Sequence, residues 1–145
     1  MIRLSKLLLL LTVLGGTLLG ILTAQTPKPM SLEKTLRANR WQKRVLLLAA
    51  PTAEQADFRQ QKALLATQAT ALNARDFLVL EVFYQQLSEA DTQFLTRKIG
   101  LRPPAFAAVL IGKDGGVKKR STKPIAPQSL FDIVDQMPMR RQEMR

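Results

Sequence analysis

The sequence predicts an α/β domain whose four-stranded mixed sheet carries helices on both faces. Two apolar runs of strand length, residues 44–50 and 76–84, are separated by a helical segment, which predicts parallel strands joined by a right-handed crossover. Two further strands, residues 105–112 and 117–122, flank the turn "KDGG" and predict an antiparallel hairpin. The chain of 145 residues is 46% hydrophobic, which is enough for one core without covalent cross-links.

The N-terminal segment, residues 1–24, has the layout of a secretory signal. Two basic residues precede an apolar run over residues 7–24, and small residues stand at its end. We prefer cleavage after Ala24, although Leu22 occupies a position where a small residue is favoured. The apolar run also reaches the lower limit of about 18 residues for a membrane span, so an uncleaved signal-anchor is the alternative. In either case we expect the rest of the chain to be exported, to the periplasm or beyond.

The remaining chain divides into a spacer and one domain. Residues 25–30 are proline-rich and form the spacer, and the domain spans residues 31–145. Ser31 is a suitable N-cap for a short amphipathic helix ahead of the first strand. Ser88 and Asp91 have the spacing of a cap that opens another short helix between the second and third strands.

The crossover helix and the last helix complete the order of elements. Thr52 and Gln55 have capping-box spacing, which predicts a helix that begins there and continues to about Leu72. The last helix follows Pro127, and its apolar face consists of Leu130, Ile133, Val134 and Met137. The resulting order is helix, strand, helix, strand, helix, hairpin, helix. This is the order of a thioredoxin-like fold.

Four segments also carry a resemblance to a known family. They are "NRWQKRVLLLAAP", "FLVLEVF", "VLIGKDGGVKKRS" and "DQMPMRRQEMR". In this order and spacing they resemble a bacterial family of exported domains of unknown function. That family is similar to the peroxiredoxin-like domains, called P-DUDES, of animal sushi-repeat matrix proteins. The resemblance covers residues 32–145 and implies a thioredoxin-like fold, but the family has no settled activity.

The resemblance also shows where redox chemistry is missing. In redox-active thioredoxins two cysteines follow the first core strand, and that register falls on Thr52 and Gln55. The proline that faces those cysteines aligns with Ala107, whereas Pro103 and Pro104 lie slightly earlier. Cysteine is absent from the whole chain, so dithiol oxidoreductase and peroxidase activities are excluded on residue type.

Composition limits the remaining chemistry and indicates the kind of partner. The chain has no histidine, 22 lysines and arginines, and 11 aspartates and glutamates. The exported part therefore stays strongly positive, and we expect anionic partners such as lipid headgroups, cell-wall polymers or acidic proteins. Nucleic acid is not expected, because the protein is exported and the basic residues have no aromatic stacking set beside them. The sequence indicates no cofactor and no metal site.

A candidate binding crevice follows from the topology. Ligands of open α/β sheets favour the carboxyl ends of the parallel strands, where the third strand begins. The polar residues expected around that crevice are Thr52, Gln55, Glu81, Tyr84 and Arg102. Glu81 lies within an apolar strand, so it is either a functional carboxylate or a residue exposed or ion-paired with an arginine on an edge strand. We prefer the second interpretation.

Three further features have two interpretations each. The candidate surface for an anionic partner consists of Lys113, Lys118, Lys119, Arg120 and Lys123, which equally suit the protection of an edge strand. Trp41 beside Arg40 is either a ligand-stacking residue or a packing anchor, and we prefer the anchor. The C-terminal "MPMRRQEMR" is either a partner-binding motif or a tail packed over the core, and we prefer the tail.

These observations predict a binding or accessory protein of the cell envelope, without redox activity, that acts through its basic surface. The alternative is an enzyme of unfamiliar type that uses Thr52, Glu81, Tyr84 and Arg102 without thiols.

Overall fold

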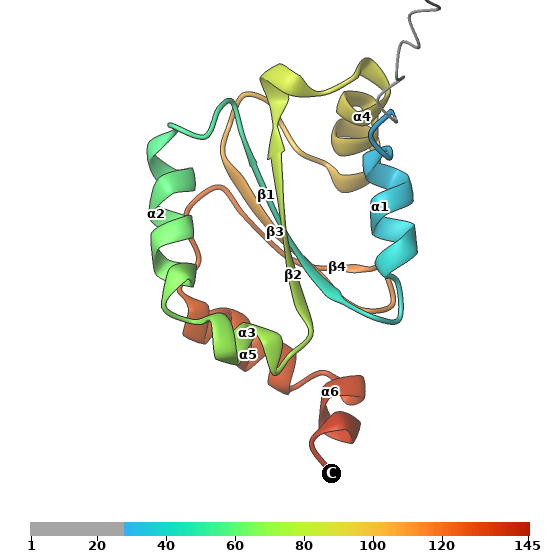
Figure 1. Ribbon diagram of the computed structural model, residues 1–145, viewed down its shortest axis with the longest axis vertical. Coiled ribbons are helices and arrows are strands. Elements are labelled where there is room, and N and C mark those ends of the chain that lie inside the picture. The colour runs from blue at the N-terminus through green and yellow to red at the C-terminus, as the bar shows by residue number, and fades with distance from the viewer. Residues whose placement is uncertain (1–27) are drawn as a thin grey trace, which may run out of the picture.

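A computed structural model describes residues 28–145 and places one four-stranded sheet between two layers of helices (Figure 1). The predicted signal segment lies outside the described residues. The helices are α1 (Leu32–Asn39), α2 (Ala56–Ala66), α3 (Ala69–Asn73), α4 (Glu89–Phe94), α5 (Pro127–Asp135) and α6 (Pro138–Glu143), with a 3-10 turn η1 (Tyr84–Gln86) and a π-helical turn η2 (Leu95–Ile99). The strands are β1 (Arg44–Ala50), β2 (Phe77–Phe83), β3 (Ala107–Ile111) and β4 (Val117–Ser121).

The sheet has the strand order β2-β1-β3-β4. β1 pairs in parallel with β2 and antiparallel with β3, and β3 pairs antiparallel with β4. The predicted crossover unit and hairpin are therefore confirmed. Every residue of β1 is buried, because this strand is central in the sheet and covered on both faces. This explains its unbroken apolar sequence.

Two core clusters lie on opposite faces of the sheet. On one face, Leu46, Leu48 and Ala50 of β1 pack against α2, α3 and α5. On the other face, the alternate residues Val45, Leu47 and Ala49 pack against α1 and η2. Helices on both faces are confirmed, and Figure 1 shows α2, α3 and α5 on one side with α1 and α4 on the other.

The start of the crossover helix differs from the prediction. Gln55 is the N-cap of α2, and its Oε1 accepts a hydrogen bond from the backbone N–H of Phe58 at 2.7 Å. The chain makes a turn after Pro51 in which the N–H of Gln55 donates to the carbonyl of Thr52 at 3.3 Å. The predicted capping box at Thr52 is therefore wrong, because the helix begins one turn later.

The continuous helix predicted to Leu72 is also wrong, because the chain bends at Thr67 and Gln68 between α2 and α3. A straight helix over residues 56–73 has a length of about 27 Å at 1.5 Å per residue. The seven-residue strands measure about 23 Å at 3.3 Å per residue. The parallel register places Phe77 beside Arg44, so the bend shortens the return to the end where β1 starts.

A partly buried ionic network holds α6 against the lower end of the sheet. The side chain of Arg44 is 1% exposed, and its Nη1 and Nη2 donate to the carboxylate of Glu143 at 3.2 and 3.3 Å. Nη1 of Arg44 also donates to the carbonyl of Arg75 at 3.0 Å. The Nζ of Lys113 binds Glu143 at 2.6 Å and Asp76 at 2.8 Å. The ion pairs therefore tie the C-terminal residues to this end of the sheet, but α6 has no buried residue and only Met137 of the predicted tail packs against the core.

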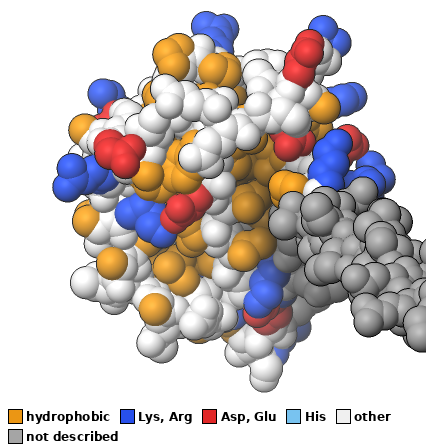
Figure 2. Space-filling model, turned by 45° about the horizontal axis from the view of Figure 1, so that its top comes forward, with side chains coloured by type: hydrophobic (Ala, Val, Ile, Leu, Met, Phe, Trp, Pro, Cys, Tyr) orange, Lys and Arg blue, Asp and Glu red, His pale blue; other side chains and the backbone are white. Residues whose placement is uncertain are grey.

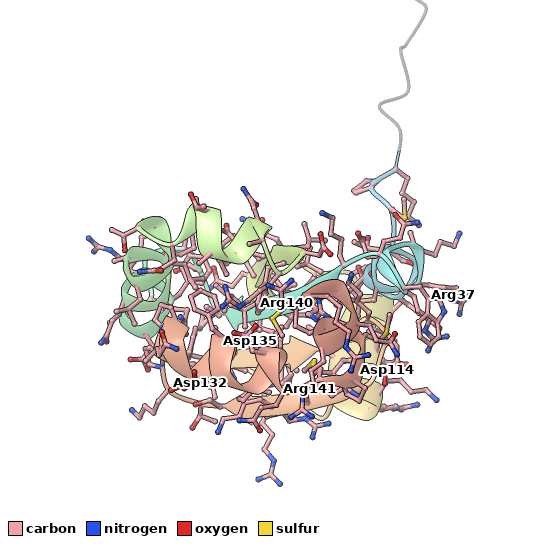
Figure 3. The ribbon with its side chains drawn as sticks, turned by 90° about the horizontal axis from the view of Figure 1, so that it is seen from below. Arg37, Asp114, Asp132, Asp135, Arg140 and Arg141 are labelled. Atoms are coloured by element: carbon pink, nitrogen blue, oxygen red, sulfur yellow. The ribbon has the colours of Figure 1, made fainter. Side chains whose placement is uncertain are left out.

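A second part of the network joins α5, α6 and the turn after α3. The guanidinium of Arg75 binds Asp135 through two hydrogen bonds of 2.8 and 2.9 Å. Arg140 donates to Asp135 at 3.3 Å and to the carbonyl of Ala74 at 2.8 Å. Figure 3 shows Arg140 and Asp135 next to each other in the view from below. These bonds fix the direction in which α6 leaves α5.

The network also shifts the pKa of two of its carboxylates, Asp135 and Glu143. Hydrogen bonding from Arg75 lowers the pKa of Asp135. Burial raises the pKa of Glu143, but hydrogen bonds from Lys113 and Arg44 outweigh burial and the net shift is downward. Both carboxylates therefore stabilise the folded state in their ionised form.

We predict that Glu143→Gln lowers the free energy of unfolding by about 2 kcal/mol. Breaking a buried ion pair costs about 3–5 kcal/mol, and we expect less because the side chain of Glu143 is 26% exposed. Urea unfolding at neutral pH measures the change. The matched control is Glu33→Gln, which breaks the exposed pair with Arg37 and is expected to cost less than about 0.5 kcal/mol. Equal effects of the two variants contradict this role for Glu143.

We predict that acid destabilises the fold through Asp135 and Glu143. Their pKa values are lowered on folding, so their stabilisation is present above the pKa of the unfolded chain and is lost as the pH falls through the folded pKa. Urea unfolding between neutral pH and about pH 3 measures the loss, which begins near the ordinary carboxyl values of about 4. The double variant Asp135→Asn, Glu143→Gln is expected to have a flatter profile, and an unchanged slope refutes the assignment.

We predict that Gln55→Ala lowers the free energy of unfolding by about 1 kcal/mol, because it removes the N-cap of α2. Thr52→Ala is expected to cost less than about 0.5 kcal/mol, since within residues 28–145 the hydroxyl of Thr52 makes no hydrogen bond. Thermal or urea unfolding of both variants checks the difference. A larger effect at Thr52 than at Gln55 contradicts the observed cap.

Candidate functional site

The carboxyl ends of β1 and β2 and the start of β3 lie at one end of the sheet. Ala50 pairs with Phe83, and Ala49 pairs with Ala107. Hydrophobic side chains gather in the middle of this end, with acidic and basic side chains around them (Figure 2). The candidate crevice residues surround this end, but within residues 28–145 no side chain of the five bonds to the side chain of another.

Glu81 belongs to the face of the sheet that α2 covers. Its neighbours on that face, Val79 and Phe83, pack against the α2 and α5 core, and its carboxylate forms an ion pair with Lys62 of α2. The side chain of Glu81 is 35% exposed, and β2 is an edge strand. This placement agrees with the structural interpretation, except that the partner is a lysine instead of an arginine. Such a pair contributes about 0–1 kcal/mol.

Tyr84 packs against the core on the opposite face of the sheet from Glu81. Its hydroxyl donates to the carbonyl of Ala105 at 3.0 Å and so holds the loop that leads into β3. Burial raises the pKa of Tyr84, which keeps the phenol protonated. Gln55, Glu81 and Tyr84 are thus each used in a structural contact. Within residues 28–145, the candidate crevice residues therefore form no arrangement of nucleophile, base and orienting group.

Arg102 and Arg120 line an open cavity of about 500 Å³ between the loop after η2 and the end of β4. Its other lining residues are Gly100, Leu101, Ala105, Phe106, Ala107, Ser121 and Thr122. The Nε of Arg120 donates to the carbonyl of Ile99 at 2.8 Å, which fixes the guanidinium over Gly100. We call this cavity the arginine groove. It has an apolar floor and two cationic side chains.

The arginine groove joins one residue of the predicted crevice, Arg102, with one of the predicted basic surface, Arg120. Sequence reasoning missed this pairing. The hairpin register is the signal that reveals it, because Ser121 pairs with Ala108 and so the end of β4 lies beside the start of β3.

Four of the five residues of the predicted basic surface lie on or just after an edge strand. β4 is at the edge of the sheet, and Lys118, Lys119, Arg120 and Lys123 are exposed. Lys118 binds Asp114 at 2.8 Å, and this hydrogen bond lowers the pKa of Asp114.

Lys113 does not belong to that surface. Its side chain is 9% exposed and binds Asp76 and Glu143 inside the ionic network. Burial lowers the pKa of Lys113, but the hydrogen bonds to the two carboxylates outweigh burial and raise it. The prediction of a surface lysine is wrong because Lys113, two residues after the end of β3, binds Glu143 of α6.

The preference for Trp41 as a packing anchor is also wrong. Trp41 is 62% exposed and has a backbone φ of 67°. Its N–H donates to the carbonyl of Lys113 at 2.7 Å, so the backbone is anchored while the indole faces solvent.

The described part of the chain offers neither a metal site nor a membrane span. Within residues 28–145, no three histidine, cysteine or acidic side chains are grouped so as to hold a metal ion. None of the helices in the same range is both long and apolar enough to cross a bilayer.

Comparison with known proteins agrees with this fold and with the family resemblance. A crystal structure of the reduced 2-Cys peroxiredoxin of Plasmodium vivax matches with a TM-score of 0.54 and 16% identity, over 76% of this chain and 85% of that chain. At this identity the match shows the fold alone, which is thioredoxin-like.

Two curated relatives are similar in sequence. Coiled-coil domain-containing protein 80 of Danio rerio is 30% identical over 86% of this chain and 17% of its own length. Sushi repeat-containing protein SRPX of Homo sapiens is 29% identical over 70% of this chain and 24% of its own length. The chain thus spans less than a quarter of each of these relatives.

A family model described as a domain of unknown function, DUF4174, matches residues 35–143. That range includes the whole sheet and all helices except the start of α1. The protein therefore belongs to the DUF4174 family, as a thioredoxin-like domain that has no cysteine.

Proposed function

We propose that residues 31–145 form a binding domain of the cell envelope, without redox activity, that holds anionic groups of an envelope component at the arginine groove. The observation that carries the proposal is the convergence of Arg102 and Arg120 on one open cavity. Thiol chemistry is excluded, because the chain has no cysteine. The N-terminal signal layout supports a location outside the cytoplasm.

The two arginines have the free donors that an anion requires. Arg102 is exposed and forms no ion pair within residues 28–145. In the same range Arg120 uses only its Nε, in the bond to Ile99, so its Nη groups remain available. A planar guanidinium binds carboxylate or phosphate through two parallel hydrogen bonds. The groove thus suits oxyanions.

Two further lysines lie at the same edge of the sheet, and Lys119 projects from the face opposite to that of Arg120. Lys119 and Lys123 are exposed, and neither forms an ion pair in the described part of the chain. Protection of an edge strand needs only scattered charges, whereas here uncompensated cations lie on both faces of the edge strand that carries one arginine of the groove. This favours a partner with repeated anionic groups, such as a phosphate-containing polymer.

The alternative of a thiol-independent enzyme has less support. Glu81 and Tyr84 lie on opposite faces of the sheet, and each is occupied by a structural contact. A catalytic carboxylate and a phenol need hydrogen-bond access to the same reacting atoms. We therefore retain the binding function.

We predict that the triple variant Arg102→Gln, Lys119→Gln, Lys123→Gln weakens binding to immobilised polyphosphate about tenfold at low salt. Each exposed charge is expected to contribute roughly 0.5 kcal/mol, and about 1.4 kcal/mol corresponds to a factor of ten. Retention of the purified protein is measured across a salt gradient, and the wild type should elute later than the variant.

The control for this experiment is the triple variant Arg59→Gln, Lys34→Gln, Lys98→Gln. It removes the same number and kinds of charge from exposed positions of α2, α1 and η2. The proposal expects this control to elute close to the wild type. If both triple variants elute together, retention reflects net charge alone and the groove is not the site.

A further inference from the structure

The loop between α1 and β1 holds a tryptophan in a strained backbone conformation. Trp41 has a φ of 67°, a left-handed value that is unusual for a bulky residue and costs energy. The bond from its N–H to the carbonyl of Lys113 fixes this conformation. The indole is 62% exposed, so burial of the side chain does not offset the strain. Strained residues of this kind gather at functional sites.

A cavity of about 210 Å³ lies beside this loop, under α1, and we call it the α1 cavity. Its apolar lining consists of Leu36, Val45, Phe94, Ile99 and Ile111, and its polar lining includes Glu33, Arg37, Arg40 and Lys43. An apolar cavity of about 150 Å³ binds benzene, whereas pockets for drug-sized ligands measure about 300–1,000 Å³. The α1 cavity therefore has room for one ring or one short alkyl chain. It shares no lining residue with the arginine groove.

Three basic side chains line the α1 cavity, and within residues 28–145 one of them is paired with a carboxylate while two are not. Arg37 binds Glu33 at 3.0 Å, and Figure 3 shows Arg37 on the outer side of α1. Arg40 and Lys43 form no ion pair within residues 28–145. The guanidinium of Arg40 lies so close to Gly115 that a Cβ there would be 2.7 Å from its Nε. This arrangement holds an uncompensated positive charge beside an apolar cavity.

We propose that the α1 cavity binds an amphipathic anion. A ring-sized or short alkyl group enters the cavity, and an adjoining carboxylate binds Arg40 and Lys43 at its rim. Trp41, between these two residues in the loop, covers the bound group from the solvent side. The same chemistry is present in a free short-chain carboxylate and in the apolar C-terminal residue of a peptide. This site is independent of the arginine groove and of the function proposed for it.

Hexanoate is the probe that tests the site. The chain has one tryptophan, so the fluorescence of Trp41 reports on this loop directly. We expect hexanoate to produce a saturable change in emission, together with methyl chemical-shift changes at Leu36 and Ile111. The neutral alcohol of the same length and acetate should each bind at least tenfold more weakly. Absence of both signals with hexanoate, or equal binding of the alcohol, overturns the proposal.

Two variants and one control variant separate binding from stability. Arg40→Gln should weaken hexanoate at least tenfold by chemical-shift titration, whereas Arg59→Gln on α2 should leave the affinity unchanged. Trp41→Gly should keep or raise the midpoint of thermal unfolding, because glycine adopts positive φ without strain, yet should weaken hexanoate at least threefold. Equal affinities of Arg40→Gln and the wild type refute the site.

A titration with peptides identifies the source of the anion. A short peptide that ends in leucine with a free carboxylate is compared with its C-terminally amidated form by the same titration. Tighter binding of the free peptide than of hexanoate assigns the site to protein C-termini, and weaker binding assigns it to small carboxylates. Binding of the amidated form as tight as that of the free form contradicts the role of the carboxylate.

Discussion

The buried guanidinium of Arg44 is the constraint on which the lower half of the molecule depends. It lies at the first position of the central strand and is 1% exposed, so it requires a charged partner and hydrogen bonds. Glu143 supplies the charge from the far end of the chain, and Arg75 supplies a carbonyl. Lys113 shares Glu143, and its own carbonyl holds the N–H of Trp41. The position of the exposed tryptophan is therefore linked to the burial of Arg44.

At the opposite end of the sheet, side chains near the carboxyl ends of β1 and β2 make structural contacts. Gln55 caps α2 near the position where redox-active thioredoxin-like proteins carry cysteines, and Tyr84 holds the loop before β3. Both side chains form hydrogen bonds with backbone groups, whereas a catalytic side chain at this place would have to react with a substrate. The arginines of the groove lie beside this end, on the flank where β4 joins β3.

Much of the architecture was predictable from sequence because it rests on local patterns. The apolar runs defined β1 and β2, "KDGG" defined the hairpin, and Ser31 and Ser88 were identified as caps that accept hydrogen bonds as expected. What was missed depends on long-range contacts. Arg44 and Glu143 are 99 positions apart, and no periodicity connects them. A lysine beside a turn, such as Lys113, is normally solvated, so only the packing of α6 reveals its burial.

The candidate sites, too, were predictable only where they depend on local sequence patterns. The sequence indicated the end of the sheet and the basic edge, but it could not show which cations converge, because Arg102 and Arg120 approach only through the register of β3 and β4. Both cavities depend on η2, a π-helical turn of a kind that is frequent at functional sites. The side chain of Ile99 lines the α1 cavity, while its carbonyl holds Arg120 in the arginine groove. The two sites are therefore built on the same short turn, although they share no lining residue.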